Sequence, residues 1–431
     1  MKSNEKERAI LVGLALNSNG RWETEEHLDE LELLADTAGA VVFDRFIQEK
    51  EKIDSAYFIG RGKAEMISNR AHERNIDLLI FDDDLSPAQV RNLEKISGIK
   101  ILDRSGLILD IFARRAKTKE AKTQVELAQL NYLLPRLTRQ WTHLSRQVGG
   151  IGTRGPGETQ LEVDRRLIRK RIGALSKELL KIKHQREVRR RRRDVILKVA
   201  LVGYTNAGKS TLMNALTRSE VFVEDRLFAT LDPTIRRIKL SNHLDVLLID
   251  TVGFIRKLPH HLVASFMSTL EEVKDADALL NVVDISHPHL FEQMTVVKDV
   301  LRQLQILYKP TLFVFNKIDK LEHKGLITRL RNEYQSSVFI SATKGLFLED
   351  LQEKIRKMSS ETIVEISITL DIKYSDIVSK IYKYAEVLET KYDQKNIKVK
   401  LRSTQEKAKK IERLLKGRNY IQSVLTQVEH E

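Results

Sequence analysis

Short apolar runs alternate with amphipathic stretches over the first 103 residues. The apolar runs cover residues 9–16, 40–46, 77–81 and 100–102, and helical spacing fills residues 24–37, 62–75 and 86–96. Ser86 followed by Pro87 is a typical helix start, with a capping residue before Pro at the first helical position. Strands that alternate with helices predict a small parallel α/β sheet for residues 1–103.

Residues 104–194 change to a heptad pattern. Apolar residues recur at alternating spacings of three and four, at Leu127, Leu130, Leu134, Leu137, Trp141, Leu144 and Val148, and the stripe resumes at Leu161, Ile168, Ile172, Leu175, Leu179 and Ile182. Two heptad helices joined by a loop predict an antiparallel hairpin, which we call the arm. We expect helices from residue 120 and over 162–193, a kink at Pro135, and Thr159 as the cap of the second helix.

The last two regions again mix strands and helices. In residues 195–358, apolar strands end at Gly203, Asp250, Asn316 and Ser341. In residues 359–431, the pattern predicts a strand at 365–372, a helix at 375–392, a strand at 397–401 and a helix at 405–416. The sequence thus predicts four domains: 1–103, 104–194, 195–358, and a small α+β unit at 359–431.

Composition narrows the class of protein. The 431 residues are 42% apolar and include no cysteine, which excludes a disulfide scaffold and a cysteine-based zinc site. The charged start MKSNEKERAI is unlike a signal peptide, and no stretch approaches the roughly 20 apolar residues of a membrane span. We therefore expect a soluble, cytoplasmic protein without a membrane span, and a monomer.

Positive charge is concentrated in the arm. The net charge is +14, and residues 104–193 hold 24 Lys and Arg against 8 Asp and Glu, so the rest of the chain is slightly acidic. Such a concentrated excess favours a polyanionic partner, either nucleic acid or an acidic membrane surface. A solvated pair of helices with a chance excess of charge is the alternative.

Residues 203–210 carry the clearest motif. Gly203, Gly208, Lys209 and Ser210 fill the pattern G-x-x-x-x-G-K-[ST], between an apolar strand and a helix. Backbone N–H groups of such a loop surround the β-phosphate of a nucleotide, and the helix N-terminus adds positive potential. The Lys neutralises β- and γ-oxygens, and the Ser ligates Mg²⁺.

Three further strand ends complete a guanine-nucleotide site. Asp250 can reach Mg²⁺ through water, and the Gly253 N–H can hold the γ-phosphate. Asp319, in the sequence NKID, can accept both N1–H and N2–H₂ of guanine, a donor pair that adenine lacks, so GTP is favoured over ATP. The backbone of residues 341–343 can meet guanine O6. The architecture places ligands at these carboxyl ends of parallel strands.

The segment between these motifs has the features of a nucleotide-sensing switch. Residues 227–234, LFATLDPT, must offer a hydroxyl to Mg²⁺ and an N–H to the γ-phosphate, and release both after hydrolysis. Thr230 is the candidate, with Thr234 as the alternative. Where a Ras-like enzyme places a water-orienting Gln, this chain has Phe254, which predicts slow intrinsic hydrolysis and a trigger from a partner.

The predicted nucleotide site takes its residues from five segments. They are Gly203, Tyr204, Thr205, Asn206, Ala207, Gly208, Lys209, Ser210 and Thr211; Phe228, Ala229, Thr230, Leu231 and Asp232; Asp250, Thr251, Val252 and Gly253; Asn316, Lys317, Ile318 and Asp319; and Ser341, Ala342 and Thr343. Among them, Ser210, Thr230 and Asp250 are the expected Mg²⁺ ligands, and Lys209, Thr230 and Gly253 the expected catalytic groups. The fold class is therefore a P-loop GTPase domain with a mixed, mostly parallel Ras-like sheet.

A glycine-rich stretch, VGGIGTRGPGETQ, lies between the two arm helices. It contains a G-x-G-x-x-G spacing, but a dinucleotide loop needs a preceding strand, and here a helix precedes. Glycines at the tip of the arm (residues 149–157) would let the backbone approach another surface closely, while a simple turn is the alternative. The predicted RNA contacts are Gly149, Gly150, Gly152, Arg154, Gly155 and Gly157, with Arg189, Arg190, Arg191, Arg192 and Arg193 at the base.

These motifs together resemble the HflX family of translational GTPases. The similarity rests on GGIGTRGPGETQLEVDRR (149–166), GYTNAGKST (203–211), LFATLDPT (227–234), DTVGFIRKLPH (250–260) and NKID (316–319), and extends from the N-terminus to about residue 358. The resemblance implies GTP-dependent binding to the large ribosomal subunit and its RNA, hydrolysis stimulated by the ribosome, and splitting of stalled or idle ribosomes under stress. It also implies an arm that reaches toward the peptidyl-transferase centre.

Two other functions fit parts of the sequence. A signalling switch or adaptor could bind a protein or an acidic membrane surface through the basic arm, which would make it a peripheral membrane protein. ATP-driven RNA remodelling by the N-terminal unit would depend on residues 60–63 alone, which form no phosphate loop. Asp82, Asp83 and Asp84 at a strand end could hold a metal, although adjacent carboxylates more often face water.

Overall fold

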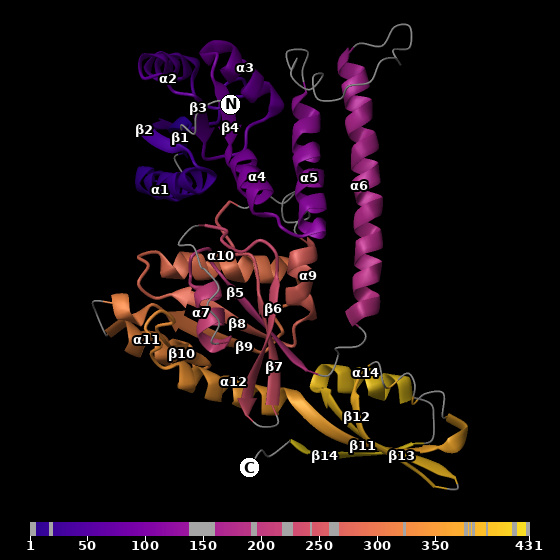
Figure 1. Cartoon of the computed structure of the whole chain (residues 1–431). Helices are drawn as coiled ribbons and strands as arrows, with labels where there is room; N and C mark the ends of the chain where they lie inside the picture. Colours follow the sequence, from indigo (N-terminus) through magenta and orange to yellow (C-terminus); the bar gives the residue numbers. More distant parts are fainter. Residues whose placement is uncertain are drawn as a thin grey trace. The chain divides into compact units, whose positions relative to one another are not determined.

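Figure 1 shows the computed structural model of the chain. It describes residues 6–16, 20–137, 160–190, 196–217, 227–241, 244–257, 267–321, 325–374, 378, 381, 384–393, 395–415 and 420–427. The chain divides into two compact units. The first holds Met1–Ile182, Asp225–Asp232 and Lys257–Met267, and the second holds Lys183–Glu224, Pro233–Arg256 and Ser268–Glu431. The domain boundaries that the sequence suggests at 103, 194 and 358 stay predictions.

The first unit contains the predicted small parallel sheet. Strands β1 (Arg8–Leu16), β2 (Val41–Lys50), β3 (Leu78–Phe81) and β4 (Lys100–Asp103) pair in the order β2-β1-β3-β4, all parallel. Helices α1 (Arg21–Ala38), α2 (Arg61–Glu73) and α3 (Pro87–Ser97) connect them. Ser86 caps α3 through a capping box with Gln89. The predicted α/β alternation is confirmed.

The acidic triplet that follows β3 does not simply face water. Asp82 is 1% exposed and accepts a hydrogen bond from Arg104, itself 1% exposed, at 2.6 Å. Lys257, from a stretch that packs with this unit, donates to both Asp82 and Asp83. The expectation of three solvated carboxylates is therefore wrong for Asp82, because two cations neutralise it inside the unit.

The arm begins as an antiparallel helix pair. Helices α5 (Lys119–Leu133) and α6 (Gln160–Arg190) are joined to the sheet through α4 (Arg104–Arg115). Ion pairs join Lys119 to Glu178 and Glu126 to Arg171. The earlier residue of α5 pairs with the later residue of α6, so the two helices run in opposite directions. Ile168 and Leu175 of the heptad stripe are buried. The antiparallel arrangement is thus confirmed within the described residues.

Proline ends the first arm helix rather than kinking it. Helix α5 stops at Leu133, and Pro135 lies in the short 3₁₀ turn η1 (Leu134–Arg136). The prediction of a continuous helix with a kink at Pro135 is wrong at this point, because Pro removes a backbone donor and clashes with the preceding turn. Trp141, Leu144, Val148, the tip 149–157 and Thr159 lie outside the described residues.

A buried carboxylate joins the base of the arm to the sheet. Asp103 is 0% exposed and accepts hydrogen bonds from the Gly106 and Leu85 amides, the Tyr132 hydroxyl and Arg136. Arg136 also stacks over the Tyr132 ring at 3.7 Å. Burial, with the Asp103 charge, raises the pKa of Tyr132, so its phenol stays a donor.

The predicted switch segment contacts the same unit. Asp232 accepts hydrogen bonds from the Lys117 and Thr118 amides and from the Thr118 hydroxyl, immediately before α5. The Phe228 ring packs edge-on against Phe112, with centroids 4.7 Å apart. These contacts place the side chains of Phe228 and Asp232 against α4 and the start of α5.

The second unit is built on a six-stranded sheet. Strands β5 (Leu197–Gly203), β6 (Thr234–Ser241), β7 (Leu244–Asp250), β8 (Ala278–Asp284), β9 (Thr311–Asn316) and β10 (Ser337–Phe339) have the order β10-β9-β8-β5-β7-β6. Only β6 runs antiparallel. Helices α7 (Lys209–Thr217), α9 (Met267–Asp275), α10 (Leu290–Gln303), α11 (Gly325–Glu333) and α12 (Leu348–Thr362) connect the strands. The mixed, mostly parallel sheet is as predicted.

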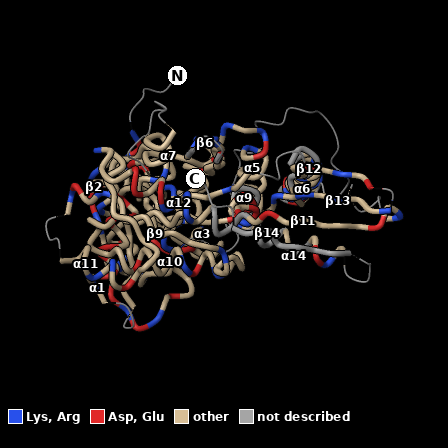
Figure 2. Tube along the Cα trace, turned by 90° about the horizontal axis from the view of Figure 1, so that it is seen from below, with Lys and Arg blue, Asp and Glu red and all other residues tan. Residues whose placement is uncertain are grey.

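The C-terminal residues form an antiparallel sheet in the order β12-β13-β11-β14. Its elements are β11 (Ile363–Asp371), the 3₁₀ turn η4 (Ile372–Tyr374), β12 (Glu386–Tyr392), β13 (Asn396–Thr404), α14 (Gln405–Leu415) and β14 (Tyr420–Gln427). The helix predicted for 375–392 is wrong over its last seven residues, which form β12. Figure 2 shows basic and acidic residues together along β12 and β13.

None of the helices within the described ranges is long and apolar enough to cross a membrane.

Replacing Asp103 by Asn should destabilise the first unit strongly. The asparagine amide keeps the shape of the side chain, but its NH₂ group faces groups that donate hydrogen bonds to Asp103. Removing one partner of a buried ion pair also costs about 3–5 kcal/mol of stability. Thermal unfolding of the full chain should show this unit melting earlier. Asp36→Asn is the matched control, because Asp36 is exposed in its 3.9 Å pair with Lys6 and such pairs contribute about 0–1 kcal/mol. Equal shifts for the two variants would contradict the role assigned to Asp103.

Candidate functional site

Two glycines allow the phosphate loop to lie close to its neighbours. Gly203 ends β5 with φ 148°, and a Cβ there would lie 2.2 Å from the Val282 carbonyl oxygen. Gly208 has φ 92°, and its Cβ would lie 2.3 Å from Asn316 Nδ2. Both positions combine positive φ with a backbone or amide contact, so a larger residue would displace the loop or the strand beside it. Helix α7 begins directly after Gly208.

Lys209 is buried at the start of α7. Its ammonium donates to the carbonyl oxygens of Gly203 at 3.1 Å and Tyr204 at 2.7 Å. Burial lowers the pKa of Lys209 to about 8, and the Asp250 charge opposes that shift. A cation held this way is suited to meet phosphate oxygens, which would complete its hydrogen bonds and recover its charge.

A hydroxyl and a carboxylate suited to Mg²⁺ lie side by side. Ser210 Oγ donates to Asp250 Oδ2 at 2.6 Å, at the carboxyl ends of the neighbouring strands β5 and β7. Mg²⁺ prefers oxygen ligands of these two kinds. The buried hydroxyl of Thr205 has no hydrogen-bond partner among the described residues. A polar loop with such an atom, and without room for a Cβ at Gly203 or Gly208, fits a nucleotide with its metal ion.

The segment after Asp250 runs along the phosphate loop. Phe254 is 1% exposed; its N–H donates to the Gly203 carbonyl at 3.1 Å, and its carbonyl accepts from the Thr205 N–H at 2.7 Å. A Cβ at Gly253 would lie 2.7 Å from Thr205 Cα and 2.9 Å from Lys209 Nζ. Gly253 therefore lies beside Lys209, and Phe254 presents no polar side chain. The predicted contact of the Gly253 N–H with the γ-phosphate stays a prediction.

One asparagine connects three parts of the site. Asn316 donates from Nδ2 to the Ala207 carbonyl at 2.9 Å and accepts at Oδ1 from the Ala342 N–H at 3.0 Å. It is buried at the end of β9, and it ties the phosphate loop to residues 341–343. Lys317 adopts the left-handed conformation and pairs with Asp284 at 2.7 Å. Asp319 follows in the 3₁₀ turn η3 (Ile318–Lys320) and is exposed.

Some predicted residues make contacts within the fold, belong to the other unit or lie outside the described ranges, and their roles stay predictions. The Thr251 hydroxyl donates to the Leu201 carbonyl at 2.7 Å, and Val252 is buried. Residues 228–232, with the expected Mg²⁺ ligand Thr230, belong to the first unit, so their nucleotide contacts stay predictions. Helix α6 ends at Arg190, and residues 191–193 lie outside the described ranges, as does the glycine-rich tip.

Two contacts of the site are absent from the sequence prediction. The Tyr204 hydroxyl accepts from the Arg256 N–H at 2.9 Å, and Asp284 at the end of β8 pairs with Lys317. The sequence signal for Asp284 exists, since it ends an apolar strand between two predicted motif strands. The Tyr204 contact has no signal, because it spans 52 residues and depends on the path of the chain after Asp250.

Models of known protein families match three consecutive parts of the chain. The family described as GTP-binding GTPase N-terminal matches residues 25–113, the GTP-binding GTPase Middle Region matches 115–193, and the 50S ribosome-binding GTPase family matches 198–317. A GTP-binding protein of the archaeon Sulfolobus solfataricus, solved with GDP, is 29% identical and covers 82% of this chain and 99% of its own, with a TM-score of 0.44.

The relatives extend over most of the chain. The GTPase HflX of Flavobacterium psychrophilum is 48% identical over 384 residues, which cover 84% of this chain and 92% of that protein. The GTPase HflX of Caldanaerobacter subterraneus is 47% identical, covering 93% and 92%, and that of Escherichia coli is 43% identical, covering 88% of each. Together with the phosphate loop and its neighbouring strand ends, this similarity shows that the chain belongs to the HflX family of GTPases.

Proposed function

We propose that this GTPase binds GTP with Mg²⁺ and, in that state, docks its basic arm on the large ribosomal subunit and its RNA. The bound state dissociates or rescues stalled or idle ribosomes, and hydrolysis stimulated by the ribosome releases the protein. The observation that carries the proposal is the position of Phe254. It is buried and hydrogen-bonded to the phosphate loop through its backbone, in the place where a water-orienting side chain is needed.

Each residue of the site has its own role in binding the nucleotide. Lys209 neutralises β- and γ-oxygens, and Ser210 with Asp250 supplies oxygen ligands, to which Thr230 would add a third. Mg²⁺, when bound, neutralises charge on the phosphates during transfer. Asp319 accepts the guanine donors, while Asn316 keeps the phosphate loop and residues 341–343 in register. Since Phe254, directly after Gly253, has no polar side chain, the group that orients the attacking water comes from the partner.

The described part of the arm supports an RNA partner. Helix α6 exposes Arg169, Lys170, Lys177 and Lys181, and its Glu178 is paired with Lys119 of α5. Cations held on a rigid helix pair can follow phosphates along a nucleic-acid backbone, and their binding releases counterions. An acidic membrane surface or an acidic protein would meet the same charges, and the tests below separate these partners.

GTP turnover should rise strongly when purified large ribosomal subunits are added at about 150 mM salt, near physiological ionic strength. An external trigger raises turnover in Ras-like enzymes by about 10³-fold or more, so a rise of at least about 100-fold is expected. The Lys209→Ala variant with the same subunits controls for contaminating GTPases. Measurable GTP binding without stimulation would exclude the ribosomal trigger.

Asp319→Asn should change the base that the site prefers. The amide cannot accept both guanine donors, and hydrogen bonds to charged groups contribute about 1.5–3 kcal/mol each, so GDP affinity should fall by about 100-fold. Affinity for xanthosine diphosphate should rise, because its 2-oxo group can accept from the new amide. Equilibrium binding of both nucleotides measures this, with Asp299→Asn as control, an exposed carboxylate paired only with Arg302 in the described contacts. Unchanged GDP affinity would contradict the assignment of Asp319.

Deleting residues 149–157 should weaken binding to the large subunit and stop ribosome splitting, while turnover without ribosomes stays unchanged. Wild-type binding should weaken steeply with salt, because contacts to phosphates release counterions. Sedimentation of the subunits with the protein, at several salt concentrations, measures both. Equal binding and splitting by the deletion would show that the tip has no role. Flotation of the protein with acidic liposomes, but no binding to subunits, would favour the adaptor function instead.

A further inference from the structure

We infer that the Tyr204 hydroxyl holds residues 253–256 against the phosphate loop in a conformation that accepts GDP but not GTP, so that Tyr204 is a positioning residue that sets the preference between the two nucleotides. This inference rests on the proposed nucleotide site and adds to it a residue that controls which nucleotide is favoured.

Residues 253–256 are fixed to the loop at consecutive points. Phe254 exchanges two backbone hydrogen bonds with Gly203 and Thr205, in a parallel bridge centred on Tyr204. The Tyr204 side chain, 5% exposed, extends this contact by accepting from the Arg256 N–H at 2.9 Å. The backbone hydrogen bonds between this segment and the phosphate loop end at Phe254. The Tyr204 hydroxyl adds one more contact, to the Arg256 N–H.

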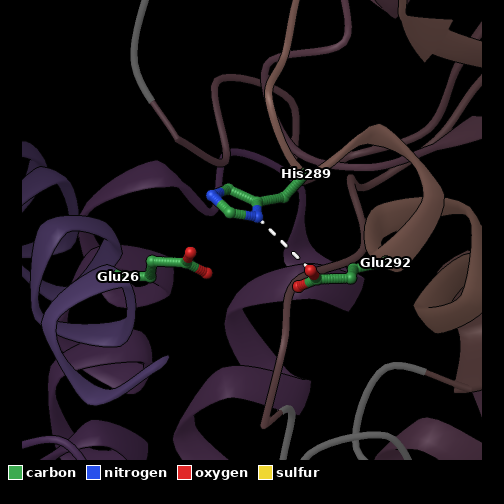
Figure 3. A group of neighbouring side chains, drawn as sticks. All are labelled: Glu26, His289 and Glu292. Carbon is green, nitrogen blue, oxygen red and sulfur yellow. Dashed lines mark hydrogen bonds and ion pairs between the residues drawn. The ribbon is translucent and has the colours of Figure 1, made fainter. Parts of the chain in front are cut away.

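The Arg256 side chain fixes the far end of the segment. Its guanidinium pairs with Glu292 at the start of α10 and is only 14% exposed. Glu292 also lies 3.3 Å from His289 Nδ1, and Figure 3 shows this pair. Because both the amide and the side chain of Arg256 are engaged, the direction of the chain after Phe254 is set by Tyr204 on one side and by α10 on the other.

This conformation places Gly253 against Lys209. A Cβ added at Gly253 would lie 2.9 Å from Lys209 Nζ and 2.7 Å from Thr205 Cα. Two of the three ammonium protons point at loop carbonyls. A γ-phosphate oxygen that meets Lys209 from the Gly253 side requires residues 253–256 to move away, which breaks the contact between Tyr204 and Arg256. GDP lacks that phosphate and leaves the contact intact.

The unpartnered hydroxyl of Thr205 supports a second conformation of the loop. Thr205 contacts Gly253 through its Cα and Cγ2, and its hydroxyl is buried, where an unsatisfied polar atom is costly. A rearrangement that admits a phosphate oxygen or a water beside Gly253 would satisfy it. The described conformation is thus held by the Tyr204 and Arg256 contacts in spite of one unsatisfied group in the loop.

Loss of the Tyr204 hydroxyl should change the affinity for GTP but not the affinity for GDP. Tyr204→Phe keeps the loop backbone, through which Tyr204 is predicted to meet the phosphates, and removes the hydroxyl contact with Arg256 from the free and GDP-bound forms alike. GDP affinity therefore stays the same. The GTP-bound form has already lost the contact, so affinity for a non-hydrolysable GTP analogue rises. One net hydrogen bond corresponds to about 3- to 10-fold. The affinity for the GTP analogue rises because only the free and GDP-bound forms contain the hydrogen bond. A general loss of folding could not produce a gain in affinity.

The experiment measures dissociation constants of GDP and guanylyl imidodiphosphate, with Mg²⁺, for the full-length wild type, Tyr204→Phe and Tyr132→Phe. The last is the matched control, because it also loses one phenolic hydrogen bond, to Asp103 at 2.7 Å, in the other compact unit. We expect a 3- to 10-fold gain for the analogue in Tyr204→Phe alone, and GDP affinities equal within about twofold in all three proteins.

Other outcomes overturn the inference. Unchanged analogue affinity would show that the hydroxyl does not oppose GTP, and an equal loss for both nucleotides would show a merely structural role. Glu292→Ala removes the ion pair between Arg256 and Glu292 without touching the phosphate loop. If Tyr204→Phe proves too unstable to measure, this variant should shift the preference in the same direction, and no shift would count against the inference. Wild-type protein that fails to bind GDP would instead overturn the proposed site itself.

Discussion

Backbone close packing beneath the phosphate loop is the constraint on which the rest of the GTPase site depends. Gly203 lies so near the Val282 carbonyl that no Cβ fits between them, and Gly208 lies equally close to the Asn316 amide. Because β8 and β9 are neighbours in the sheet, a shift at Gly203 would also move Asp284 and Asn316. The phosphate loop, the base-recognition strand and the loop after β10 therefore keep their relative positions only while these two glycines are present.

The N-terminal unit uses buried charge for a similar purpose. Asp103 gathers donors from the chain before β4, from the start of α4 and from the end of α5. A salt bridge within such a network contributes little net stability, but losing one partner is costly. Its effect is positional, because one carboxylate fixes where the arm leaves the sheet. The sequence offered no sign of this, since Asp103 looks like an ordinary helix cap and its partners lie 3 to 33 residues away.

Sequence reasoning succeeded where a local pattern determines the structure. The strands around Gly203, Asp250 and Asn316, and the alternation in the first 103 residues, follow from apolar periodicity and short motifs. It failed for β12, where Val387 and its neighbours alternate over only seven residues, and pairing with β13 decides between strand and helix. It also failed to predict the end of α5 at Leu133. The path of Phe254 along the phosphate loop depends on contacts between distant segments, which no window of sequence contains.

The low pKa of Lys209 links nucleotide binding to the proton concentration. Burial lowers the pKa of Lys209 to about 8, so near neutral pH a larger fraction of this amine is unprotonated than for an ordinary lysine. Polyphosphate bound to the ammonium restores its full charge, so each binding event takes up a fraction of a proton from the buffer. The measured heat of nucleotide binding then varies with the ionisation enthalpy of the buffer, and affinity declines as the pH rises through 8. The phosphate loop is in this sense also a proton-coupled binding site.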